Sequence, residues 1–117
     1  MATVCIDCAD AHEMAAFYGQ LLGWEVTFAE REWVLMRDPA GGTGLSFQVE
    51  ADYRDPTWPA SQDGQDKMLH LDLEVDDLDA AVAYAIVCGA RLVDLQPRER
   101  VRVMLDPAGH PFCLFLD

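Results

Sequence analysis

Basic residues are scarce in this chain, and long hydrophobic runs are absent. Lys and Arg number 8 against 21 Asp and Glu, which gives the 117 residues a formal net charge of −13. Such a charge repels phosphate backbones, so we predict no nucleic-acid partner. No apolar run approaches the ~20 residues of a membrane span, and the first residues lack the basic start of a signal peptide. We therefore expect a cytoplasmic protein that does not bind membranes and whose charge favours cationic ligands.

Cysteines are few, and their placement does not indicate a disulfide framework. Cys5, Cys8, Cys88 and Cys113 lie in apolar or strand-like segments rather than in loops. Cys5 and Cys8 have the spacing of a redox pair, but residues i and i+3 of a strand point to opposite faces. We predict reduced and mostly buried cysteines, with a redox pair as the alternative.

The sequence contains an internal duplication. The tetrapeptide Asp-Pro-Ala-Gly occurs at residues 38–41 and again at 106–109. A helix is predicted over residues 10–23 and another over 77–89, because each segment begins with a capping aspartate, carries an apolar stripe of helical period and ends at glycine. Repetition of the whole pattern indicates two copies of one structural unit.

Segments of strand character surround each predicted helix. The expected strands cover residues 3–8, 24–29, 33–37 and 45–50 in the first half, and 68–75, 91–95, 100–105 and 112–116 in the second. One helix covers only one face of such a sheet, so the halves must pair to cover more surface. The sequence predicts a single α+β domain over 1–117: two tandem βαβββ modules, 1–50 and 68–117, joined by a connector over 51–67, with sheets that curl into a cup.

Three groups of residues resemble a known superfamily in their order and spacing. They are Phe17-Tyr18 with Leu21-Leu22-Gly23-Trp24, the segment 70–78 beginning at His70, and the segment 106–112. The chain resembles the vicinal oxygen chelate superfamily of glyoxalases, bleomycin-resistance proteins and extradiol dioxygenases. Its Trp58-Pro59 connector is similar to that of a glyoxalase-like subgroup common in bacteria. The resemblance implies a homodimer, but the superfamily hosts enzymes and binding proteins alike, so fold does not fix function.

The resemblance also implies metal ligands on the first and last strand of each half. We match those positions to Thr3, Gln48, His70 and Cys113. His70 and Gln48 are the expected ligands if a divalent metal (Zn, Ni, Mn or Fe) binds. The set lacks both the two-histidine, one-carboxylate site of an iron oxygenase and the carboxylate base of a glyoxalase, so we expect no cofactor.

Strand alternation predicts the other residues that line the cup. Arg102 alternates with Val101 and Val103, so we expect its guanidinium to face Asp72 and Glu74, with a charged, exposed edge strand as the alternative. Trp58 is expected to be a pocket lid or a dimer contact. The predicted ligand-binding residues are Cys5, Asp7, Gln48, Trp58, Asp72, Glu74, Arg102 and Cys113.

Three functions fit these residues. The first is binding or sequestration of a small molecule without catalysis, because the metal site is degenerate. The net charge of −13 would favour a cationic ligand. The second is a metal-dependent lyase, isomerase or dioxygenase, supported by the fold and His70. The third is a metal-free enzyme in which His70 works as an acid or base with Asp72 or Glu74. We predict the first and leave open whether the protein is an enzyme.

Overall fold

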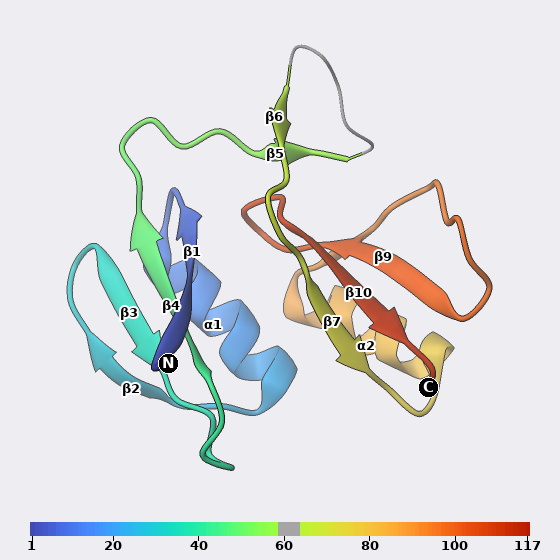
Figure 1. Cartoon of the computed structure of the whole chain (residues 1–117), viewed down its shortest axis with the longest axis horizontal. Coiled ribbons are helices and arrows are strands. Elements are labelled where there is room, and N and C mark those ends of the chain that lie inside the picture. The colour runs from blue at the N-terminus through green and yellow to red at the C-terminus, as the bar shows by residue number, and fades with distance from the viewer. Residues whose placement is uncertain (59–63) are drawn as a thin grey trace. The chain divides into compact units, whose positions relative to one another are not determined.

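The computed structural model describes residues 1–58 and 64–117 (Figure 1). The chain divides into two compact units, Met1–Arg54 and Asp55–Asp117. Among the described residues, each unit contains one helix and one four-stranded sheet, which confirms the predicted α+β class. Neither of these helices has the length and apolar character that crossing a membrane requires.

The first unit follows the predicted strand–helix–strand–strand–strand order. Its elements are β1 (Thr3–Cys8), α1 (Ala11–Leu22), β2 (Val26–Ala29), β3 (Trp33–Met36) and β4 (Gly44–Val49). The strand order in the sheet is β1-β4-β3-β2, with β1 parallel to β4 and the other pairs antiparallel. The helix begins where Asp10 accepts backbone N–H groups and ends at Gly23, whose φ is 71°, so both predicted caps are confirmed.

The second unit repeats this topology. Its elements are β5 (Pro56–Thr57), β6 (Gln65–Asp66), β7 (Leu71–Glu74), α2 (Leu78–Cys88), β8 (Arg91–Leu92), β9 (Val101–Leu105) and β10 (Pro111–Phe115). The sheet order is β7-β10-β9-β8, with β7 parallel to β10. Two expectations need correction: β7 and β8 are shorter than the predicted strands, and the predicted connector contains the parallel pair β5–β6.

Each helix covers one face of its own sheet. In the first unit Tyr18 of α1 is 1% exposed, and its ring stacks on that of Phe47 of β4 with centroids 5.6 Å apart. In the second unit Phe112 and Leu114 of β10 are buried beneath α2, 0% and 2% exposed. Burying each such side chain stabilises the fold by about 1.5–3 kcal/mol. The opposite face of each sheet is therefore free of helix, and the candidate site lies there.

The two Asp-Pro-Ala-Gly turns fold alike. In turns 38–41 and 106–109 the aspartate Oδ1 accepts the alanine N–H (2.8 and 2.9 Å). The aspartate carbonyl accepts the glycine N–H, at 2.9 Å in both, and the glycine φ is 90° and 85°. Only glycine adopts such angles without strain. The sequence repeat is thus a structural repeat.

The four cysteines are free thiols, as predicted. Cys5 is exposed whereas Cys8 is buried, which agrees with their expected placement on opposite faces of β1. The expectation that the cysteines are mostly buried is wrong, because Cys88 and Cys113 are only half-buried.

Candidate functional site

The candidate site lies on the helix-free face of the second sheet. In the parallel pair of β7 and β10, Asp72 is opposite Cys113 and Glu74 is opposite Phe115. Residues paired in this way share a face of the sheet, and their neighbours in sequence point to the other face. Since Leu114 is buried on the α2 side, these four side chains define the helix-free face.

A histidine, a carboxylate and a thiol meet on this face. His70 directly precedes β7, and its Nε2 lies 3.3 Å from Asp72 Oδ1. One donor atom from each of His70, Asp72 and Cys113 lies within 4.8 Å of the others. We call these three residues the second-unit cluster. The side chains of His70 and Asp72 are 39% and 59% exposed, so a solute can reach them.

Burial raises the pKa of the Cys113 thiol, and the charge of Asp72 and a hydrogen bond to it raise the pKa further. Lys67 opposes this shift with its positive charge. All the larger influences favour the protonated form. Cys113 is therefore a neutral thiol near pH 7, and a neutral thiol is a poor base and a poor nucleophile.

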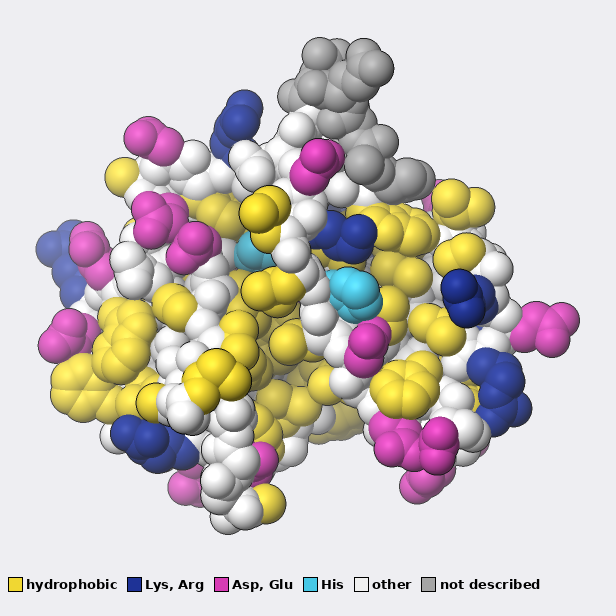
Figure 2. All heavy atoms as spheres, viewed as in Figure 1, with side chains coloured by type: hydrophobic (Ala, Val, Ile, Leu, Met, Phe, Trp, Pro, Cys, Tyr) yellow, Lys and Arg dark blue, Asp and Glu magenta, His cyan; other side chains and the backbone are white. Residues whose placement is uncertain are grey.

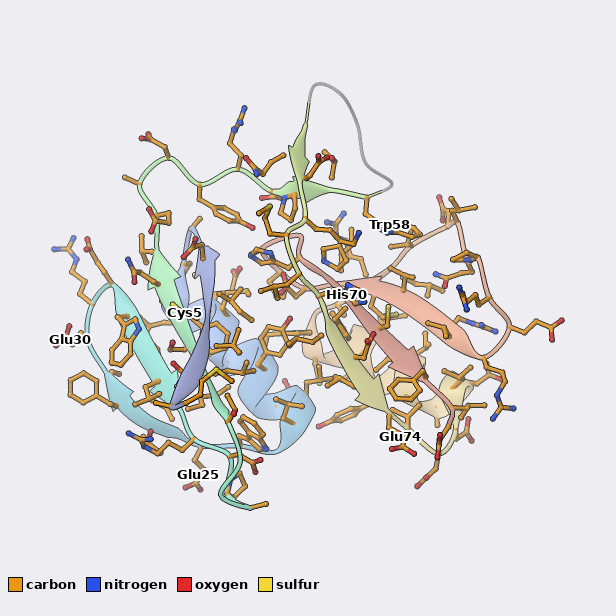
Figure 3. The ribbon with its side chains drawn as sticks, viewed as in Figure 1. Cys5, Glu25, Glu30, Trp58, His70 and Glu74 are labelled. Carbon is orange, nitrogen blue, oxygen red and sulfur yellow. The ribbon has the colours of Figure 1, made fainter. Side chains whose placement is uncertain are left out.

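Glu74 is not part of the cluster. It ends β7, at the opposite end of the strand from His70 (Figure 3). The sequence leaves open whether Asp72 or Glu74 pairs with His70, and the structure selects Asp72. A spacing of two residues on one strand is enough here because Asp72 lies on the same side of the chain as the imidazole.

In the first unit the corresponding face carries hydroxyl groups. The register of β1 and β4 pairs Cys5 with Ser46 and Asp7 with Gln48. Thr3 Oγ1 and Ser46 Oγ are hydrogen-bonded at 3.0 Å. The side chains of Cys5 and Asp7 are exposed, as is that of Gln48. The predicted placement of these residues on the face away from the helix agrees with this register.

The repeat shows which residues correspond between the units. The N-caps Asp10 and Asp77 lie 67 residues apart, and the same offset relates Ser46 to Cys113 through the strand registers. Gln48 therefore corresponds to Phe115. Strand register thus makes Ser46, and not Gln48, the counterpart of Cys113 in the repeat, while the assignment of Gln48 as a metal ligand stays a prediction. Counting from the capping aspartates would have found it.

Arg102 does not face Asp72 and Glu74 as expected. It pairs with Leu114, and the next residue of β9, Val103, pairs with Cys113. Arg102 thus belongs to the α2 side of the strand, and its Nη1 donates to backbone carbonyls within 98–101, at 2.9–3.2 Å. The predicted alternation has the right period but the opposite phase.

Trp58 follows β5 and is half-buried. Figure 3 labels it in the second unit. Its role as a lid or dimer contact stays a prediction. The other half of the Trp58-Pro59 motif, Pro59, lies outside the described residues.

The comparisons with known proteins agree with this geometry. The sequence profile of a family described as "Glyoxalase-like domain" matches residues 3–115. A Burkholderia phytofirmans PsJN structure, described as a glyoxalase/bleomycin resistance protein/dioxygenase family enzyme, has a TM-score of 0.73 and 19% identity, and the alignment covers 98% of this chain and 96% of that one.

Two similar structures are fosfomycin resistance proteins called FosX. The Mesorhizobium loti protein has a TM-score of 0.71 and 14% identity, with 100% of this chain and 91% of that one covered. A variant from Listeria monocytogenes, complexed with Mn(II) and 1S,2S-dihydroxypropylphosphonic acid, has a TM-score of 0.72 and 13% identity, with coverages of 98% and 87%. At such identities these likenesses show the fold alone.

No curated protein matches the sequence significantly. The family match nevertheless spans both units, their capped helices and the second-unit cluster. The resemblance of the sequence to the vicinal oxygen chelate superfamily is thereby confirmed. The chain belongs to the glyoxalase-like domain family.

Proposed function

We propose that this protein binds a small molecule on the helix-free face of its second sheet and does not convert it. The observation that carries the proposal is the pair formed by His70 Nε2 and Asp72 Oδ1, 3.3 Å apart and accessible to solvent. Such a pair presents a hydrogen-bonding imidazole beside a negative charge. It can recognise a ligand that carries both a polar group and a positive charge.

Apolar side chains beside the pair supply contact area. Phe115 of β10 is half-buried and shares the helix-free face with Val101 of β9, its partner in the sheet. Small-molecule sites are typically apolar surfaces with a few placed polar groups. We therefore expect the ligand to lay an apolar body against Phe115 and to direct its polar end toward His70.

Electrostatics favour a cationic ligand. Asp72 and Glu74 lie on this face, and the whole chain carries a formal charge of −13. Figure 2 shows acidic side chains spread over the surface in view. A surface of one sign concentrates ligands of the other sign and speeds their association.

The last-strand position argues against proton abstraction. There the resemblance to glyoxalases implies a carboxylate base, and this chain has Cys113, whose pKa is raised by burial and by Asp72. A protonated thiol does not take a proton from a substrate at neutral pH. The first-unit counterpart, Ser46, is a hydroxyl bonded to Thr3.

A metal-free acid–base enzyme is the second candidate, because a carboxylate beside an imidazole orients and strengthens a general base. A metal-dependent enzyme of the superfamily is the third, and the donor atoms of the second-unit cluster support it. Incubation of the bound ligand, followed by NMR, separates binding from both: unchanged ligand supports our proposal, and turnover contradicts it.

Binding is tested by screening cationic and neutral aromatic molecules by thermal shift and then calorimetry. A ligand at 100 times its Kd adds about 2.7 kcal/mol to the free energy of unfolding. Asp72→Asn should weaken the Kd of a cationic ligand about 10- to 100-fold, since hydrogen bonds to charged groups contribute about 1.5–3 kcal/mol. Glu25→Gln is the matched control, because it changes the net charge equally at an exposed residue of the first unit (Figure 3). Equal weakening in both variants would assign the effect to overall charge and contradict the site.

Homodimerisation is part of the proposal and comes from the family resemblance. Light scattering coupled to size exclusion measures it directly. A monomer at all concentrations would contradict it.

A further inference from the structure

We infer that β2, the edge strand of the first unit, docks an extended peptide segment that has a β-branched centre and a basic residue at each end. In the sheet order β1-β4-β3-β2 this strand is last, and among the described residues it pairs only with β3. An edge strand presents a row of backbone N–H and C=O groups to which a further strand can bond. The edge shares no residue with the proposed ligand site of the second unit.

Apolar side chains border this edge on both faces of the sheet. All four residues of β2 are exposed, and the exposed fractions of Val26 and Phe28 are 48% and 47%. A bulge separates the two, because Val26 pairs with Met36 whereas Phe28 pairs with Leu35. Consecutive residues of β3 point to opposite faces, so Val26 and Phe28 do so as well. An added strand would cover both side chains.

Phe28 and Trp33 form an aromatic pair beside the edge. Met36 faces α1, because a Cβ on Gly19 would lie 3.6 Å from its Sδ, and Phe28 therefore lies on the helix-free face. Its ring centroid is 5.7 Å from that of Trp33, with the ring planes at 56°. Aromatic residues of a sheet pack well against β-branched side chains of the neighbouring strand. We therefore expect valine, isoleucine or threonine at the centre of the docked segment.

The charges at the two ends of β2 select the partner. Glu25 precedes the strand and Glu30 follows it, both are exposed, and Figure 3 labels them at its opposite ends. The adjacent Arg31 and Glu32 balance each other in charge. Antiparallel pairing of two copies centred on β2 would set Glu25 opposite Glu30, and like charges placed opposite each other are destabilising. A foreign segment with basic residues about five positions, or ~16 Å, apart would instead neutralise both glutamates.

The second unit shows how such an edge is blocked. Its corresponding strand, β8, has only two residues and begins with Arg91. Beyond β8 the side chain of Gln96 occupies the edge of β9: its Oε1 accepts the N–H of Val103 at 2.9 Å, and its Nε2 donates to the Val103 carbonyl at 3.0 Å. Short strands, charges and covered edges prevent strand addition. β2 contains neither a charged residue nor proline, and its bulge limits the added strand to a few residues.

Fluorescence anisotropy with a labelled synthetic peptide, Lys-Thr-Val-Thr-Val-Lys with blocked ends, tests the inference on the native full chain. We expect one binding site per chain, and slower hydrogen exchange at amides of residues 26–29 when the peptide is bound. Two matched peptides serve as controls, one with glutamate at both ends and one with its central amides N-methylated. Each should bind at least about 10-fold more weakly, since the first loses the opposite charges and the second loses the backbone donors.

Variants of the chain locate the site. Phe28→Lys should weaken the Kd of the peptide at least about 10-fold. Leu92→Lys is the matched control and should stay within about 2-fold, because Leu92 is 44% exposed on the edge strand of the other unit and the charge change is the same. The double variant Glu25→Gln and Glu30→Gln should weaken binding about 3- to 10-fold. Far-UV circular dichroism checks that each variant is folded.

Four outcomes overturn the inference. They are absence of binding up to about 1 mM peptide, equal binding of the N-methylated or the glutamate-ended peptide, equal weakening by Leu92→Lys and Phe28→Lys, and a dimer in light scattering that Phe28→Lys dissociates. The last would assign the edge to a second copy of the chain. The peptide assay needs no small molecule, so its failure leaves the calorimetric test of the second-unit site unaffected, and failure of that test leaves the peptide result standing.

Discussion

Asp106 makes the two homologous turns unequal, and this inequality predicts a stability difference. Its side chain is 1% exposed, and its Oδ1 accepts the N–H groups of Ala108 and His110, both at 2.9 Å. Among the described residues, the counterpart Asp38 accepts one such bond, from Ala40 at 2.8 Å. Truncation to alanine removes the acceptor in either turn, but Asp106→Ala removes two hydrogen bonds in a buried turn and Asp38→Ala removes one in an exposed turn.

The magnitude follows from these bonds. A hydrogen bond to a charged acceptor contributes about 1.5–3 kcal/mol. We therefore expect Asp106→Ala to lower the free energy of unfolding by about 3–4 kcal/mol and Asp38→Ala by about 1 kcal/mol. Asp106→Asn keeps a carbonyl oxygen near the Oδ1 position, so it should lose only about 1 kcal/mol.

Urea unfolding followed by far-UV circular dichroism measures the free energies, and hydrogen exchange of a peptide spanning 106–112 localises the loss. We expect faster exchange at the amides of Ala108 and His110 in Asp106→Ala. A difference below about 0.5 kcal/mol between Asp106→Ala and Asp38→Ala would refute the reasoning. A loss in Asp106→Asn as large as that in Asp106→Ala would show that charge, and not the acceptor geometry, stabilises the turn.

Three further predictions concern glycines and the Cys113 thiol. Gly41→Ala should lower the free energy of unfolding by about 1 kcal/mol, because its φ is positive. Gly109→Ala should lower it by ~1–2 kcal/mol more, because a Cβ at residue 109 would lie 2.9–3.0 Å from side-chain atoms of Asp55, whereas a Cβ at residue 41 would have no atom within 4 Å. Equal losses in urea unfolding would contradict this. Asp72→Asn should speed iodoacetamide alkylation of Cys113 several-fold by lowering its pKa, as mass spectrometry can measure; an unchanged rate would contradict it. The pKa of Cys113 is raised in the folded chain, so the unfolded chain loses the thiol proton first as pH rises. The contribution of the protonated thiol to stability is therefore complete below the unfolded pKa and is lost as pH rises from there through the folded pKa. The native Tm should fall more than that of Cys113→Ser between about pH 8 and pH 10, and parallel Tm curves would contradict the assignment.

Helices could be predicted from the sequence because their ends depend on local chemistry. Asp10 and Gly23 bound α1, and Asp77 and Gly89 bound α2, as the sequence predicts. A capping side chain bonds to N–H groups two or three residues away, so no distant contact is needed to place it. The alternation of apolar residues likewise identified β1 and β7, which lie at one edge of each sheet.

Strand ends and short strands depend on partners that the sequence does not reveal. The predicted strand over 68–75 shortens to Leu71–Glu74, because pairing with β10 begins at Leu71. The pair β5–β6 has two residues in each strand, too few for alternation to be detectable. The pair lies within a proline- and aspartate-rich segment, and that composition predicts a connector instead.

The site residues show where alternation is insufficient. Alternation predicts that Arg102 and its neighbours in sequence point to opposite faces of the sheet. Which face Arg102 occupies is decided by its pairing with Leu114. The same holds for Ser46, a small side chain without ligand chemistry that occupies the counterpart of Cys113, while the more suggestive Gln48 lies two residues further along β4. Register is a property of two strands, so residue type on one strand cannot supply it. In this chain the register brings the donor atoms of His70, Asp72 and Cys113 together in the second unit, whereas their counterparts in the first unit are Thr3, Cys5 and Ser46. We therefore expect any acid–base chemistry from the second unit.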